Sequence, residues 1–205
     1  MSYISHILLG FLMAYIGLVP PGMMNMTAVR MSIVKSLSSG LRFSAGAAFV
    51  VIFQAYIALS FAKYLSQHPE VLDTLKKIAV VVFIALAIFF FLQARRKFEA
   101  EGKDRKGNEF WAGALMSSMN MLAIPFYFGY STIMETKGWI VLEQPYITFF
   151  VIGAVTGAFA LFATYSYFAQ TIVKRAQFIA SNINYILSGL FVVLAVVQLI
   201  NLVAG

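Results

Sequence analysis

Leu18-Val-Pro-Pro-Gly-Met-Met-Asn-Met-Thr27 interrupts a long apolar run near the start of the chain with two prolines, a glycine and an asparagine. A proline inside a helix removes one backbone hydrogen bond and clashes with the preceding turn, and Gly22 adds conformational freedom at the same place. In lipid, the freed backbone groups are stable only where they face protein or a polar cavity. Pro20, Pro21 and Gly22 are therefore predicted to line a transport path. A kinked helix that only packs against its neighbours is the alternative.

The composition of the chain is that of an integral membrane protein. Of its 205 residues, 61% are hydrophobic and 11% are charged, and the mean hydropathy is +0.84. Soluble domains carry about 25% charged residues. The absence of cysteine excludes disulfides and thiolate metal sites. The apolar run from residue 4 onward has no preceding positive charge and no good cleavage site, which favours a retained span over a signal peptide.

Six segments are apolar over the roughly 20 residues that a helix needs to cross a bilayer. They are residues 4–29, 41–63, 75–94, 110–134, 146–169 and 183–204. The predicted fold is an all-α integral membrane protein with six transmembrane helices.

The basic residues indicate how these spans are oriented. If the first connection is cytoplasmic, eleven Lys and Arg residues lie inside and four lie outside. The inside set is Arg30, Lys35, Arg42, Arg95, Arg96, Lys97, Lys103, Arg105, Lys106, Lys174 and Arg175, and the outside set is Lys63, Lys76, Lys77 and Lys137. This positive-inside bias predicts a multi-pass protein of the cytoplasmic (inner) membrane with both termini outside. The same bias explains the net charge of +7, because most of the basic residues lie in the loops on the cytoplasmic side of the lipid bilayer. No nucleic-acid partner is needed to explain this charge.

The only strongly hydrophilic stretch divides the spans into two groups of three. It predicts a first three-helix repeat at 1–94, a charged cytoplasmic linker at 95–109 and a second three-helix repeat at 110–205. Because three is odd, the second copy would be inverted relative to the first, as in many secondary transporters.

Two alignments of the halves compete. Met24-Asn-Met-Thr-Ala-Val29 resembles Met119-Asn-Met-Leu-Ala-Ile124 at an offset of 95 residues, but that offset misplaces the sixth span. Pairing Pro21 with Pro125, 104 residues later, aligns all three spans and puts both prolines at similar depth. The proline register is preferred, and each half is predicted to begin with a proline-broken helix.

Away from their ends the spans hold no Asp or Glu, and the polar residues that remain there are neutral. Without carboxylates a divalent-metal carrier is disfavoured, and without a Ser–His pair an intramembrane protease lacks its base. We expect no enzyme activity, no cofactor and no metal. Amides and phenols suit a small zwitterionic or neutral solute, although they also join helices or anchor them at the interface. The polar candidates are Asn25, Thr27, Gln54, Tyr56, Asn120, Tyr127, Tyr130, Tyr165 and Gln170.

The predicted substrate path combines the two proline regions with a subset of these polar side chains. Its residues are Pro20, Pro21, Gly22, Asn25, Gln54, Tyr56, Asn120, Pro125 and Tyr127.

The layout resembles the LysE-type translocators, a family of small bacterial six-span amino-acid exporters. That family carries a Pro-Gly-Pro motif late in its first span, and here Pro21-Gly22 is followed by Met23. Ser39-Gly40 and Gly46 resemble the glycine-punctuated segment that follows.

The second motif of that family, Asn-Pro-Lys in the fourth span, is matched here only at Pro125, with Ile124 and Phe126 in the flanking positions. The fixed charge of the motif is therefore missing. The resemblance implies export of amino acids or related small metabolites, linked to the proton-motive force.

Two other functions fit the residues. A structural or assembly factor is suggested by the uncharged spans and by the small-residue faces around Gly10 and Gly153. A channel-like facilitator of small neutral solutes is the other. The same small-residue faces make a homodimer possible.

Overall fold

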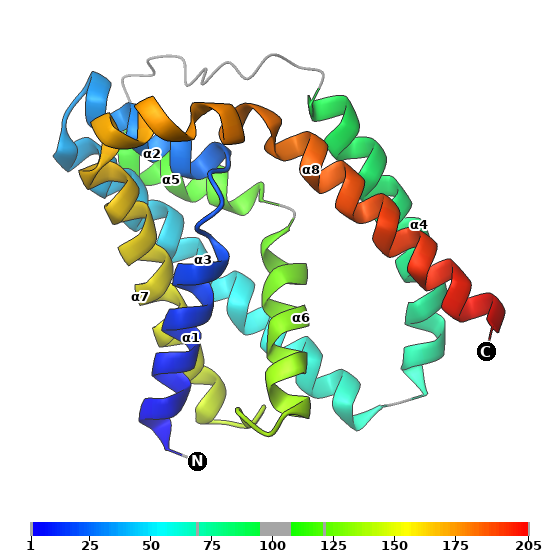
Figure 1. The fold of residues 1–205 in the computed structure, drawn as a ribbon. Coiled ribbons are helices and arrows are strands. Elements are labelled where there is room, and N and C mark those ends of the chain that lie inside the picture. The colour runs from blue at the N-terminus through cyan, green and yellow to red at the C-terminus, as the bar shows by residue number, and fades with distance from the viewer. Residues whose placement is uncertain (1, 69, 95–107, 121, 205) are drawn as a thin grey trace. The chain divides into compact units, whose positions relative to one another are not determined.

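The computed structural model describes residues 2–68, 70–94, 108–120 and 122–204, and all the regular structure in these ranges is α-helical (Figure 1). The helices are α1 (Tyr3–Gly17), α2 (Met23–Val34), α3 (Leu37–Gln67), α4 (Val71–Ala94), α5 (Glu109–Ser118), α6 (Ala123–Thr136), α7 (Tyr146–Tyr167) and α8 (Ala169–Ala204). The all-α prediction is confirmed. Of the predicted linker, only Asn108 and Glu109 lie within the described residues.

The first predicted span of each half is divided into two helices. Residues 4–29 form α1 and α2, separated at Leu18–Gly22, and residues 110–134 form α5 and α6. The other four predicted spans lie within single helices to within two residues. Within the described ranges, α3 and α7 are long and apolar enough to cross a membrane by length and composition, while α1 is apolar but shorter.

The position of the second break differs from the prediction. The chain leaves the helix after Ser118 and re-enters it at Ala123, so that Pro125 is the third residue of α6. A proline is tolerated in a first turn because the N–H groups there have no partner within the helix. The fourth span is therefore broken as predicted, but the break lies just before Pro125, which belongs to the first turn of the following helix.

The chain divides into two compact units, each of which draws on both halves of the sequence. One contains Met1–Tyr64 and Ala100–Ala176, and the other contains Leu65–Glu99 and Gln177–Gly205. In the second unit α4 packs on α8, where the Phe90 and Phe191 rings stack at 5.8 Å. Both breaks lie in the first unit.

Glycines bring α1 and α7 into backbone contact in the first unit. A Cβ atom at Gly10 would overlap the carbonyl oxygen of Phe150, and one at Gly153 would overlap that of Ile7. Such small residues let two helices approach closely in a membrane. The small-residue faces of the two helices thus pack against each other within the chain, which removes them as a reason to expect an assembly partner.

The same contact joins α5 to α3. A Cβ atom at Gly113 would overlap the Phe43 carbonyl oxygen, and one at Gly46 would overlap that of Phe110. Gly113 follows Gly10 by 103 residues, and Gly153 follows Gly46 by 107. In each pair, therefore, a helix from the first predicted span of one half packs on the helix of the second predicted span of the other half. These spacings lie close to the 104-residue register and far from 95.

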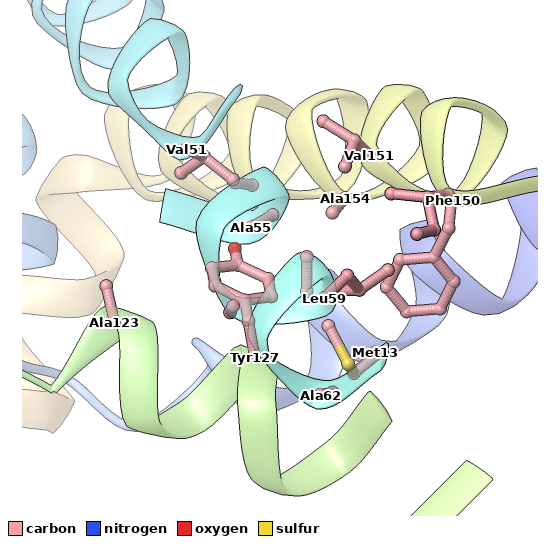
Figure 2. Packing of buried hydrophobic residues seen from close by; sticks show 14 of the residues in the cluster. Met13, Val51, Ala55, Leu59, Ala62, Ala123, Tyr127, Phe150, Val151 and Ala154 are labelled. Carbon is pink, nitrogen blue, oxygen red and sulfur yellow. The ribbon is translucent and has the colours of Figure 1, made fainter. Parts of the chain in front are cut away.

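The largest buried apolar cluster of this unit lies between α1, α3, α6 and α7 (Figure 2). Met13, Leu59, Tyr127 and Phe150 contribute its larger side chains. The connection between α6 and α7 is fastened to α1 by a hydrogen bond of 2.9 Å, which the Val141 N–H donates to His6 Nε2. This packing fixes the position of α1, which ends at the first break, and of α6, which begins after the second break.

Candidate substrate path at two helix breaks

Three successive backbone carbonyls of the first break accept hydrogen bonds from side chains. Asn25 Nδ2 donates to the carbonyl oxygens of Leu18 (2.8 Å) and Pro20 (3.0 Å). The hydroxyl of Tyr165, on α7, donates to the carbonyl oxygen of Val19 at 2.5 Å. These carbonyls therefore face protein, as lipid requires, and they are already occupied as hydrogen-bond acceptors.

The N–H groups at the start of α2, in contrast, have no side chain as a hydrogen-bond acceptor. α2 begins after Gly22 with no side-chain cap and no acidic residue in its first turn. α1 ends with no basic residue in its last turn. Helix ends carry partial charges, positive at the N-terminus and negative at the C-terminus. The break therefore brings two helix ends of opposite sign together, neither of them compensated by a charged side chain of its own helix.

There is open space at the start of α2. A Cβ atom built on Gly22 would have no other atom within 4 Å, and its φ of −97° is an ordinary value for any L-residue. The space beside the N-cap residue of α2 is therefore open, and helix N-termini are sites at which anionic groups bind.

At the second break, both carbonyl and N–H groups of the backbone have hydrogen-bond partners. Gln54 Nε2, on α3, donates to the Ser117 carbonyl oxygen at 2.7 Å. Asn120 Oδ1 accepts from the Leu122 N–H at 3.2 Å, and the Asn120 carbonyl accepts from the Ala123 N–H. Pro125, in the first turn of α6, has no N–H to satisfy. Among its described residues, this break consequently offers fewer free donors than the first one.

The two breaks lie beside each other. Asn120 Nδ2 approaches Met24 Sδ at 3.8 Å, linking the second break to the first turn of α2. A Cβ atom at Gly17, in the last turn of α1, would overlap the ring of Phe126. Phe126 occupies the position at which the resemblance described above implies a lysine, so that an aromatic ring and not a charge meets the end of α1.

A pocket of about 390 Å³ extends along α1 and α6 from the first break. Gly17 and Pro20 lie at its end near the break, and none of the described residues that line it is charged. The lining residues are Leu9, Leu12, Met13, Ile16, Gly17, Pro20, Tyr130 and Met134.

Two of the predicted tyrosines lie away from this pocket lining. The Tyr127 side chain is buried, and its hydroxyl has no hydrogen-bond partner among the described residues. Figure 2 shows this hydroxyl directed toward α3 near Val51 and Ala55. Tyr56 is exposed and accepts a hydrogen bond of 2.7 Å from Gln144 Nε2.

The structure thus gathers most of the predicted path residues at the two breaks. Pro20, Pro21 and Gly22 form the first break, and Asn25, Gln54 and Asn120 hydrogen-bond the break segments. Pro125 lies in the turn after the second break. Tyr56 is not part of this group, since it leaves α3 about 200° around the helix from Gln54.

Sequence reasoning did not place Tyr165 on the predicted path, although it is a polar residue in an apolar span. Its donation to Val19 depends on the packing of α7 beside the first break, across 146 residues of sequence. Within the described ranges, no cluster of His, Cys, Asp and Glu could hold a metal ion.

An ion pair joins the two halves on the far side of the breaks from the pocket. Lys35 Nζ, between α2 and α3, lies 3.4 Å from Glu109 Oε1 at the start of α5, and Ser39 Oγ donates to the same oxygen. The pKa of the Glu109 carboxyl is lowered by a hydrogen bond from its own backbone N–H, against partial desolvation, and further by Lys35 and Arg42. The carboxylate is thus held in its charged form beside Lys35.

Comparison with known proteins identifies one family. The sequence model of the LysE type translocators matches residues 15–202, which include both breaks and nearly the whole chain. No curated protein and no solved structure matches the chain.

Proposed function

Because this chain belongs to the LysE type translocator family, and is therefore a multi-pass membrane protein, we propose that it exports amino acids or closely related small metabolites across the cytoplasmic membrane. The observation that carries the proposal is the first break, where the uncapped end of α2 faces open space at Gly22. Proton-motive-force linkage is part of the proposal and rests on the family resemblance.

An amino-acid head group matches the charges of the first break. Its carboxylate would accept hydrogen bonds from the free N–H groups at the start of α2, at the positive end of the helix dipole. Its ammonium group would lie toward the carbonyl end of α1, at the negative end. Discontinuous helices hold zwitterionic substrates in this way in other transporters. The carbonyls of Leu18, Val19 and Pro20 each already accept one hydrogen bond, from Asn25 or Tyr165, which leaves each oxygen one further lone pair.

We also propose that the two halves form an inverted repeat. The matching glycine contacts support it, since α1 meets α7 through the same backbone atoms by which α5 meets α3. Each pair is held by direct backbone contact, and packed elements of this kind move as rigid bodies. Alternating access would then be a rocking of the α1–α7 pair against the α3–α5 pair about the two breaks.

The charge bias supports an orientation for this movement. With the basic connections inside, α1 and α6 belong to the outer half of the bilayer, and α2 and α5 to the inner half. The pocket between α1 and α6 then lies on the outer side, while the Lys35–Glu109 pair closes the inner side. In this reading the described conformation has released its solute outward, and export requires the inner contact to separate.

The experiment is exchange of labelled amino acids by purified protein in proteoliposomes, with competitors that alter the head group. An amino-acid amide lacks the carboxylate, and an N-acetyl amino acid lacks the ammonium group. We expect the free amino acid to compete at least about tenfold better than either analogue, since each analogue loses a charge-assisted interaction.

Equal competition by the amide would refute the assignment of the α2 N-terminus. An imposed pH gradient tests the coupling, because proton-linked export accelerates with the gradient. Flux that does not saturate and ignores pH would instead identify a channel-like facilitator.

A further inference from the structure

We propose that the pocket between α1 and α6 holds the side chain of the transported amino acid, and that this side chain is uncharged and apolar. The inference rests on the proposed function, because the head group must first be held at the break. It assigns a substrate class, which neither the break nor the family defines.

One end of the pocket reaches the first break, where the proposed head-group site lies. Pro20 and Gly17 line its end near the break, and Pro20 is two residues from Gly22 at the start of α2. Leu9 and Met134 lie at its other end, because α1 runs toward the break and α6 runs away from it. An amino acid with its head group at Gly22 would therefore extend its side chain along α1, away from α2.

The chemistry of the pocket wall selects the side chain. Leu9, Leu12, Met13, Ile16 and Met134 present hydrocarbon and thioether groups, and Tyr130 contributes the only phenol of the lining. A charged side chain would lose its hydration here without a counter-charge, a loss of about 100-fold in affinity by the membrane-insertion scale.

The size of the pocket also bears on the assignment. Its volume of about 390 Å³ lies within the range of roughly 300–1,000 Å³ typical of small-molecule sites. A branched or aromatic side chain fits this space, and each methylene that fills an apolar pocket contributes roughly 10- to 200-fold in discrimination. Leucine, methionine and phenylalanine are therefore expected to be favoured over alanine, lysine and aspartate.

The test is exchange of a panel of these six amino acids by full-length protein in proteoliposomes, for the wild type and three variants. Met134→Trp fills the pocket, and Met134→Ala enlarges it. Ile133→Trp is the matched control, because Ile133 is the adjacent α6 residue, is 53% exposed and does not line the pocket. Thermal unfolding in detergent verifies that each variant is folded.

Wild-type protein is expected to exchange leucine at least about tenfold more efficiently than lysine or aspartate. Met134→Trp should reduce leucine and phenylalanine exchange at least about tenfold relative to alanine, while Ile133→Trp leaves that ratio unchanged. Should Met134→Trp not fold, Met134→Ala provides the same test by shifting the preference toward phenylalanine.

Two outcomes would overturn the inference while leaving the proposed function intact. One is lysine exchange equal to that of leucine. The other is an equal effect of the Met134 variants on every amino acid, or no effect, as expected if a lipid acyl chain fills the pocket. If folded protein exchanges no amino acid at all, the proposed function and this inference both fail.

Discussion

Replacement of Gly22 by aspartate should stabilise the protein while preventing transport. Gly22 is the N-cap of α2, its φ and ψ of −97° and −178° suit any L-residue, and no atom lies within 4 Å of the added Cβ. Aspartate at an N-cap accepts a hydrogen bond from an N–H of the first turn and favours the helix dipole. Together these contribute about 0.5–1.5 kcal/mol to the stability of the fold.

The same carboxylate would occupy the N–H groups proposed to bind the substrate. Two carboxylates about 4 Å apart repel by about 4 kcal/mol at an effective dielectric constant of about 20, which corresponds to roughly a 1,000-fold loss of affinity. Gly22→Asn is the matched variant, because asparagine caps the helix equally well but carries no charge. The Asp variant should therefore exchange amino acids far less than the Asn variant, although both are at least as stable as the wild type.

The assay combines thermal unfolding in detergent with the concentration dependence of amino-acid exchange in proteoliposomes. Equal exchange by the Asp and Asn variants, in protein that is folded, would refute the carboxylate site at α2. Destabilisation by Asp would refute the open space and the uncapped helix end from which the prediction follows.

Four further substitutions test the packing by thermal unfolding. Asn25→Ala leaves the Leu18 and Pro20 carbonyls without a donor and should lower stability by about 2–4 kcal/mol; an unchanged unfolding temperature would contradict the hydrogen bonds assigned to Asn25. Gly10→Ala forces a Cβ against Phe150 and should lower stability by about 1–3 kcal/mol, whereas Gly129→Ala, a helical glycine with open space, should raise it by about 0.5–1 kcal/mol. Similar effects of the two alanines would argue against a backbone contact between α1 and α7. Tyr127→Phe removes a buried hydroxyl that has no partner and should raise stability by about 1–3 kcal/mol; a loss of stability would show that the hydroxyl is hydrogen-bonded.

Local rules were sufficient for the membrane class, the helical fold and the first break. The composition alone excludes a soluble domain, and the steric effect of Pro20 and Pro21 acts within one turn of its own helix. The second break illustrates the limit of such rules. Pro125 is compatible both with a break and with the first turn of a new helix, and its own sequence neighbourhood does not distinguish the two.

The sequence by itself therefore determined that this is an apolar helical chain with an interruption in the first span of each half. Only the tertiary structure decided which groups close the interruptions, because those groups come from distant helices. Tyr165 reaches Val19 across 146 residues, and Gln54 reaches Ser117 across 63. These pairings depend on the glycine contacts. Because α1 packs closely on α7, and α3 on α5, particular side chains lie beside each break. The pocket along α1 and α6 follows from the same packing, since its walls are separated by more than 100 residues of sequence.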